Sequence, residues 1–235
     1  DSILEIDEKN YLSFSPRLIR FGSSGLAGVW AEENTRESIY NAFRRKETFG
    51  TSGPRIKVRF FAGYNFENSN LNDQDLIQEA YSKNIPMGGD IIQEKGKNPR
   101  FLVWAISDPL GAPLQRVQII KGWLADGEQR EKVFDVACSD GQSVNPLNHR
   151  CPDNGAKVNL DDCSISREKG NAEIKTFWQD PEFSNDQEAF YYARVLENPT
   201  CRWSTWDAVR AEEKPRSDIP ATIQERAWSS PIWIK

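Results

Sequence analysis

The sequence contains little of the chemistry on which most catalytic centres depend. Its 235 residues include one histidine, His149, and one methionine, Met87. Histidine is the side chain that most often serves as an acid–base group or a metal ligand near neutral pH. We therefore assign no catalytic residue, no metal ligand and no cofactor to these residues, and we expect that alone they do not form a complete active site.

The charge and hydropathy of the chain exclude two further classes of protein. Thirty Lys and Arg residues stand against 35 Asp and Glu residues, a net charge of −5, and the basic residues form no stripe. Because nucleic acids are bound mainly through such basic surfaces, we expect no nucleic-acid partner. No apolar run approaches the roughly 18 residues that a membrane span requires.

The chain begins with Asp-Ser-Ile-Leu, without a Met or a signal segment, which favours a removed leader or an excised piece.

The four cysteines never stand in a C-x-x-C spacing, which argues against a zinc ribbon or a thioredoxin-like site. Their even number, in surroundings rich in Asp, Asn, Gly and Pro, favours two disulfides and an exported, periplasmic or extracellular protein over four reduced thiols. Four cysteines allow three pairings. We favour Cys138–Cys151 with Cys163–Cys201, because the first pair closes a short polar loop, but the sequence does not decide among the three.

One N-terminal helix is predicted at about 35–47. Asn34 has the residue type of an N-cap, and Ile39, Ala42 and Phe43 form an apolar stripe at helical spacing. The residues before the helix are predicted to be irregular, and those at 48–54 to form a turn.

The rest of the chain is predicted to be mainly β, an antiparallel β-sandwich. Residues 55–60 alternate apolar and cationic side chains, the period of a half-buried strand. Residues 101–106 are apolar throughout, as in a strand covered on both faces. Short turns predict that residues 101–106, 114–123 and 131–137 form a three-stranded meander. Further strands are expected at 172–178, 189–196, 222–228 and 231–234, a short helix at 73–82, and a long disulfide-tethered loop at 139–171.

A resemblance to a known family becomes specific over residues 25–56, GLAGVWAEENTRESIYNAFRRKETFGTSGPRI. This stretch, with later ones at 85–90, 99–108, 117–123, 190–207 and 220–233, resembles a bacterial family catalogued as domain of unknown function 3604. The resemblance implies an exported protein in which a PHP-type metallohydrolase-like barrel, holding divalent metals, precedes these residues. Residues 1–53 would then be the C-terminal remnant of the barrel, and residues 54–235 the β-sandwich domain.

PHP-type barrels hold their metals through His, Asp and Glu side chains, of which the first in the sequence are typically an H-x-H pair. No position here matches that pair, so the resemblance assigns no metal ligand to these residues. His149 stands alone in the cysteine-rich loop. The resemblance therefore implies a fragment without hydrolytic activity of its own.

The polar residues around the predicted helix are the first candidate site. Glu33, Arg36, Lys46, Thr51 and Arg55 are the members that we consider able to reach a barrel mouth, where the arginines would hold an anionic substrate. The alternative, which we prefer, is that they cap the helix and cover its solvated surface.

The second candidate site is an aromatic set near the C-terminus. It consists of Arg202, Trp203, Trp206, Arg226 and Trp228, with Trp233 close by in the sequence. Exposed aromatic rings flanked by polar groups are suited to stack on sugar rings. The preferred alternative is that these rings belong to the core or to a domain interface.

A calcium site is a third and weaker candidate. Asp153, Asn154, Gly155, Asp161 and Asp162 place several oxygen ligands in one loop, but their spacing differs from that of an EF-hand. Such residues in loops more often form turns.

Three functional hypotheses follow. The leading one is an accessory domain that packs against the upstream barrel, which predicts an uncovered apolar face within residues 1–53. The second is a carbohydrate- or small-ligand-binding module, which predicts exposed, coplanar Trp rings on one sheet face. The third is a structural or oligomerisation domain.

Overall fold

The computed structural model describes residues 21–66 and 69–235. The first 20 residues, predicted to be irregular, lie outside the described residues. The described chain folds into two packed sheets, which confirms the mainly β sandwich, and it adds three short helices where the sequence predicted two. These helices are α1 (Arg36–Arg44), α2 (Leu76–Lys83) and α3 (Trp203–Arg210).

In the described residues, the larger sheet contains eight strands. They are β1 (Leu26–Val29), β2 (Thr48–Thr51), β5 (Asp90–Ile91), β7 (Leu114–Ala125), β8 (Glu128–Cys138), β10 (Ala189–Glu197), β13 (Arg226–Ser229) and β14 (Ile232–Ile234). Strand β10 is central: it pairs along its whole length with β7 on one edge, and with β14 and then β13 on the other. The pairing of β14 with β5 is parallel, and the others are antiparallel.

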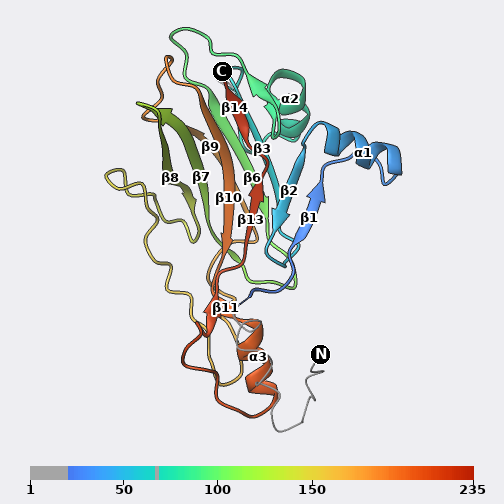
Figure 1. The fold of residues 1–235 in the computed structure, drawn as a ribbon, viewed down its shortest axis with the longest axis vertical. Helices are drawn as coiled ribbons and strands as arrows, with labels where there is room; N and C mark the ends of the chain where they lie inside the picture. Colours follow the sequence, from blue (N-terminus) through green and yellow to red (C-terminus); the bar gives the residue numbers. More distant parts are fainter. Residues whose placement is uncertain (1–20, 67–68) are drawn as a thin grey trace.

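The smaller sheet has the order β4-β3-β6-β9. Its strands are β3 (Lys57–Gly63), β4 (Ile85–Pro86), β6 (Arg100–Ile106) and β9 (Glu173–Gln179), and all pairs are antiparallel. A separate pair, β11 (Thr200–Cys201) with β12 (Thr222–Ile223), lies beside α3 at one end of the molecule (Figure 1).

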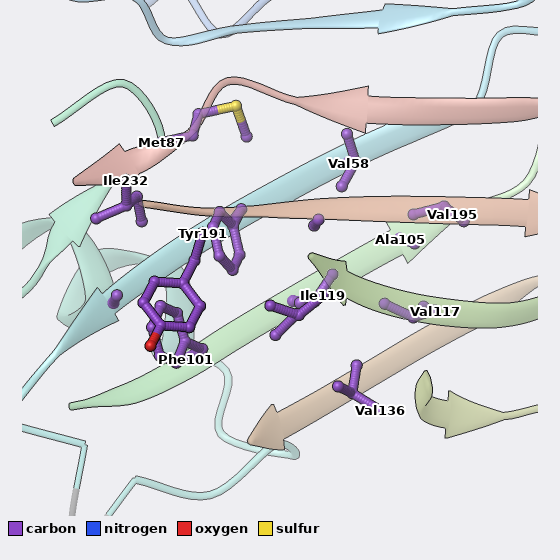
Figure 2. Close-up of a cluster of buried hydrophobic side chains, with 14 of the residues drawn as sticks. Val58, Met87, Phe101, Ala105, Val117, Ile119, Val136, Tyr191, Val195 and Ile232 are labelled. Atoms are coloured by element: carbon purple, nitrogen blue, oxygen red, sulfur yellow. The ribbon is translucent and has the colours of Figure 1, made fainter. Parts of the chain in front are cut away.

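The main core lies between the two sheets (Figure 2). Phe101 of β6 stands at its centre, with its ring centroid 4.7 Å from that of Tyr191 on β10 and 5.7 Å from that of Phe60 on β3. Leu102, the next residue along β6, points the other way into a second cluster under α2, with Leu76 and Phe61. The prediction that residues 101–106 are covered on both faces is thus confirmed for the first part of the strand.

The predicted three-stranded meander is wrong in one respect. Strands β7 and β8 form the expected hairpin, turning through Asp126 and Gly127, which both have positive φ. Strand β6, however, has both of its edges paired, with β3 and β9, and it belongs to the smaller sheet. The chain between β6 and β7 therefore crosses from one sheet to the other.

The segment around α1 differs from its prediction at both ends. The N-cap is Thr35, not Asn34, and its hydroxyl accepts the Ser38 N–H. Of the predicted apolar stripe only Ala42 is buried, and Phe43 is exposed. The residues before α1 were expected to be irregular and those after it to form a turn. Instead they pair as the β1–β2 hairpin, in which Gly28 lies opposite Phe49. A Cβ at Gly28 would come within 2.3 Å of the Phe49 ring, so this hairpin requires a glycine there.

The two disulfides are Cys138–Cys151 and Cys163–Cys201, the favoured pairing. Between them, residues 139–171 form the expected long loop, with isolated β-bridges as its regular pairing in the described structure. A disulfide stabilises a fold mainly by restricting the unfolded chain, and the restriction grows with the length of the closed loop.

Loss of the two disulfides is expected to have unequal effects. The Cys163–Cys201 bond spans 38 residues and the Cys138–Cys151 bond spans 13. Paired Cys→Ser substitutions should therefore lower the free energy of unfolding by about 4 kcal/mol for the first bond and about 3 kcal/mol for the second. Urea denaturation of both double variants measures the difference. A larger loss from the shorter loop would contradict the loop-entropy explanation.

Candidate functional site

The structure does not gather the first predicted set into one site. Thr51 is buried in β2, and Lys46 has φ of 58° where the chain leaves α1. Arg55 is exposed and donates its backbone N–H to Asp108 Oδ2 at 2.7 Å. Glu33 and Arg36 flank the start of α1, where Glu33 donates its N–H to Ser38 Oγ and accepts from the Thr35 hydroxyl. These contacts are of the capping and surface kind that the alternative interpretation expects.

The C-terminal set is divided between α3 and the large sheet. Arg202 and Trp203 both donate side-chain N–H groups to the carbonyl oxygen of Phe21, at 2.6 and 2.8 Å. Arg226 and Trp228 lie in β13, and Arg226 donates its backbone N–H to Ser52 Oγ. The Trp residues of this set therefore do not share one sheet face. Of the ten candidate residues in the two sets, Trp206 is the one that lines a cavity described below.

The loop considered for calcium forms turns. Asp153 Oδ1 accepts the Gly155 N–H at 3.0 Å, and Asp162 Oδ1 accepts the Ser164 N–H at 2.9 Å. Asn154 is buried and donates to Asn198 Oδ1. Within residues 21–66 and 69–235, no group of three or more His, Cys, Asp or Glu side chains is placed to hold a metal ion.

A cavity of about 600 Å³ opens beside the Cys163–Cys201 disulfide, at the end of the sandwich where α3 lies. Its walls come from parts of the chain that are far apart in the sequence: the β6–β7 connection, the disulfide loop, the end of β10, and α3. The lining residues are Pro54, Leu110, Gly111, Ala112, Asp162, Cys163, Ser164, Ile165, Arg167, Glu197, Thr200, Trp206 and Glu225. We call it the Glu197 pocket.

Glu197 is the unusual residue of this pocket. Its side chain is buried, with 1% of its surface exposed. Oε2 accepts the Ala112 N–H at 3.3 Å, whereas Oε1 is buried and has no hydrogen-bond partner among the described residues. Leaving a buried carboxylate oxygen unpaired is costly, because the group loses its hydration without replacement.

The surroundings of Glu197 favour its neutral form. Burial raises the pKa of this carboxyl from its ordinary value of 4.5 to about 8, and the negative charges of Asp108 and Glu225 add to the effect. The hydrogen bond from the Ala112 N–H lowers the pKa of this carboxyl, but by less than burial raises it. At neutral pH the side chain is therefore mostly a protonated acid that faces a cavity.

The full sequence matches the family described as protein of unknown function (DUF3604) over residues 4–235. The chain belongs to this family. No curated protein and no solved structure matches the sequence. The family description carries no activity, so the function of this DUF3604 chain must be argued from its own residues.

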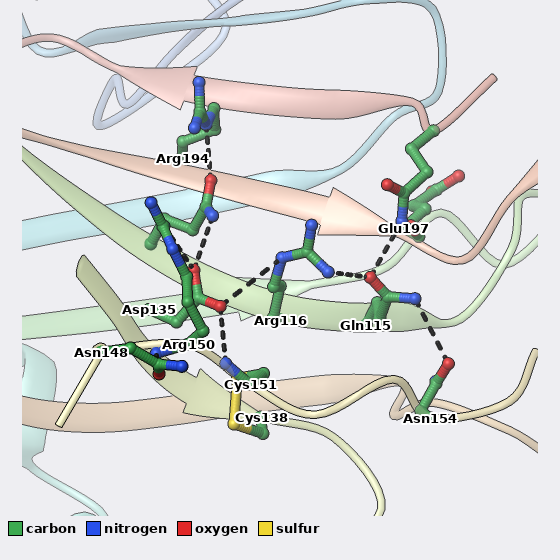
Figure 3. Close-up of polar contacts among 12 residues, drawn as sticks. Gln115, Arg116, Asp135, Cys138, Asn148, Arg150, Cys151, Asn154, Arg194 and Glu197 are labelled. Atoms are coloured by element: carbon green, nitrogen blue, oxygen red, sulfur yellow. Dashed lines mark hydrogen bonds and ion pairs between the residues drawn. A yellow bond between two sulfur atoms is a disulfide. The ribbon is translucent and has the colours of Figure 1, made fainter. Parts of the chain in front are cut away.

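A largely buried polar network joins β7 to β8 and to the disulfide loop, and Gln224 links it to the backbone carbonyl of Glu197 (Figure 3). Gln115 accepts from Gln224 Nε2 at 2.9 Å and donates to Asn154 Oδ1 at 3.2 Å, joining β7 to the disulfide loop. Asp135 accepts from Gln118 at 2.6 Å and from the Cys151 N–H at 2.7 Å. These buried groups are paired with one another, which is the pattern of a structural network rather than of an open site.

A second cavity, of about 460 Å³, lies against the smaller sheet and is lined by Tyr64, Lys97, Asn98 and Arg100, among others. Its cations are already engaged within the protein. Arg100 stacks on the Phe177 ring at 4.0 Å and donates to the Phe66 carbonyl, and Lys97 pairs with Glu94. This cavity is therefore the weaker candidate.

Glu197 is not among the residues predicted from the sequence, although the alternation of strand β10 contains a signal for it. In β10 the side chains of Ala189, Tyr191, Ala193 and Val195 are buried at every second position. Glu197 continues this phase, so the alternation already places its carboxylate on the inner side. An acid in phase with a buried apolar row is a candidate functional residue even without a motif.

Proposed function

We propose that this chain is an accessory β-domain of an exported, PHP-like metal-dependent hydrolase, and that it packs against the catalytic barrel of the same protein. The metal-binding residues would come from the barrel. The present residues would support the barrel and shape its entrance. The disulfides are consistent with an oxidising compartment. In the described part of the chain, no helix has the length and apolar character that crossing a membrane would require.

The exposed apolar surface of α1 is the observation that carries this proposal. Tyr40 and Phe43 are 58% and 50% exposed, and their spacing of three residues places them on the same side of the helix. Figure 1 shows α1 standing out at the edge of the sheets, beside β1 and β2. Leu26 of β1 is exposed as well.

A helix of a folded protein normally buries one apolar side. Single exposed apolar residues are common on protein surfaces, but two large aromatic residues on a projecting helix favour a binding surface. The residues that the structure describes leave this side of α1 uncovered. Packing against a neighbouring folded unit of the same protein would cover it.

Hydrogen exchange at the amides of α1 tests this proposal. We expect the amides of residues 36–44 to exchange at least tenfold more slowly in a longer chain that includes the barrel region than in the 235-residue chain. The substitutions Tyr40→Lys and Phe43→Lys, made together in the longer chain, should restore fast exchange because they charge the contact. Leu147→Lys is the matched control, since Leu147 is 91% exposed and lies in the disulfide loop.

Equal exchange rates in the two chains would refute packing through α1. If the helix is instead protected in both chains, and the 235-residue chain sediments as a dimer, the surface binds a second copy. That result would support the structural or oligomerisation hypothesis.

A further inference from the structure

Three carboxylates line the Glu197 pocket, and none of them is paired with a cation of the described chain. Among the described residues, no Lys or Arg nitrogen forms an ion pair with Asp162, Glu197 or Glu225. Glu225 accepts from the Ser52 hydroxyl, and Asp162 accepts from the Ser164 N–H. The charges of Asp162 and Glu225 therefore give the pocket a negative potential that the surrounding protein does not balance by direct contact, and Glu197 adds to it when it is ionised.

Arg167 is the one basic residue in the described lining of the pocket. Its Nη1 donates to the Gly111 carbonyl oxygen at 3.3 Å, and it forms no ion pair with the Glu197 carboxylate. Asp108, whose charge acts on Glu197 from the β6–β7 connection, is bound by the N–H groups of Arg55 and Leu110. Oε1 of Glu197 thus has no partner in the part of the chain that the structure describes.

Trp206 adds an aromatic surface to the same cavity. It lies on α3, is 37% exposed, and has the Arg210 guanidinium carbon 5.4 Å from its ring centroid. A cation near an aromatic face is attracted by the negative charge of the ring. An unpaired buried carboxylate and an indole ring in one cavity are the two groups that typically hold an organic cation.

We propose that the Glu197 pocket binds an organic cation, a primary ammonium or guanidinium group, with Glu197 Oε1 accepting its hydrogen bond. Asp162 and Glu225 contribute to the attraction, and Trp206 contacts the ligand. The volume of about 600 Å³ lies within the range of small-molecule sites, so the cavity suits a small molecule or a single basic side chain of a peptide.

Two other ligand classes are less well matched to these residues. A metal ion would need three or more ligands in one group, which the described residues do not supply. A neutral sugar could stack on Trp206, but it would gain no attraction from the negative charges of the pocket. A sugar is therefore an alternative outcome of the test and not the proposal.

The binding test uses agmatine, which carries a guanidinium and an ammonium group. The reporter is the indole N–H resonance of Trp206 in ¹H–¹⁵N spectra of the 235-residue chain. We expect a saturable shift with agmatine, and none with 1-butanol or methyl glucoside at equal concentration. In Glu197→Gln the affinity for agmatine should fall at least tenfold. Glu128→Gln removes one charge from an exposed position on β8 and should leave the affinity unchanged.

A second variant blocks the site without changing its charge. A Cβ at Gly111 would lie 2.8 Å from Glu197 Oε1, the atom that is to accept the ligand. Gly111→Ala should therefore reduce agmatine binding even though all carboxylates remain. Agreement between Gly111→Ala and Glu197→Gln would locate the ligand at Oε1 and separate binding from a general effect of charge.

The pH dependence of binding gives an independent check. The groups that face Glu197 are Asp108, Asp162, Arg167 and Glu225. The pKa of the free carboxyl is about 8, and a cation binds best to its ionised form. The affinity for agmatine should therefore rise by up to about tenfold per pH unit between pH 6 and 8, and it should not do so in Glu197→Gln.

The proposal would be overturned by the absence of a saturable shift with agmatine, or by an equal affinity for agmatine in Glu197→Gln. A shift with methyl glucoside in place of agmatine would also overturn it and identify a sugar site.

Discussion

Asp180→Ala is expected to lower the free energy of unfolding by about 3–5 kcal/mol, the cost of leaving a buried charge without its partner. Asp180 is completely buried, and its Oδ2 lies 2.7 Å from Lys121 Nζ, which is itself buried. Oδ2 also accepts from the Tyr191 hydroxyl at 2.7 Å, and burial together with Asp180 raises the pKa of that tyrosine. Removal of the carboxylate would strand an ammonium and a hydroxyl in the core.

An ion pair of the same length provides the control. Lys235 Nζ lies 2.7 Å from Asp90 Oδ2, but both side chains are about half exposed. Because water screens this pair, Asp90→Ala should cost less than about 1 kcal/mol. Urea denaturation of both variants at pH 7 measures the contrast. Equal losses would show that burial does not determine the contribution of the Asp180 pair.

A triple variant separates the charge from the packing. Lys121→Met, Asp180→Leu and Tyr191→Phe together remove the charges and the hydroxyl while keeping apolar volume. Buried ion pairs replaced in this way are often tolerated. We therefore expect the triple variant to be more stable than Asp180→Ala alone. A further loss would indicate that the pair contributes net stability.

The local features of this fold were predictable because they depend on short-range patterns. Alternation placed the strand at 55–60, and the separation of the cysteines pointed to the pairing that the structure shows. The sandwich followed from the predicted strands. The sheet that each strand joins was not predictable. Alternation with a period of two residues assigns side chains to one face of a strand, but it does not say which other strand lies beside it. Strand β6 was for this reason wrongly placed beside β7.

The helix α3 was not predicted because its sequence gives weak signals. Trp203–Arg210 is eight residues long, has no side-chain cap and contains Trp, Thr and Val, which favour strands. Contacts from distant segments hold it: the Thr205 hydroxyl donates to the Ala221 carbonyl at 2.7 Å, and Trp203 donates to Phe21. The Glu197 pocket depends on this helix for Trp206, so the sequence could indicate Glu197 itself but not its neighbours.

The second large effect is a loss of stability as the pH rises. The folded chain holds a proton on Glu197 up to a pKa of about 8, while an ordinary carboxyl in the unfolded chain ionises near 4.5. Between these values the folded state binds the extra proton. The stabilisation that this proton provides is therefore complete below pH 4.5, falls as the pH rises to about 8, and is constant above it. The full change is on the order of 5 kcal/mol.

Glu197→Gln should remove this dependence, because a neutral amide keeps the shape of the acid and has no proton to lose. The difference in unfolding free energy between the variant and the parent should therefore grow in favour of the variant from pH 5 to pH 8. The other titratable groups are common to both proteins and cancel in that difference. Glu128→Gln, at an exposed position, should show no such trend. A difference that stays constant with pH would mean that Glu197 is ionised in the folded chain, and that a partner for Oε1 is already present.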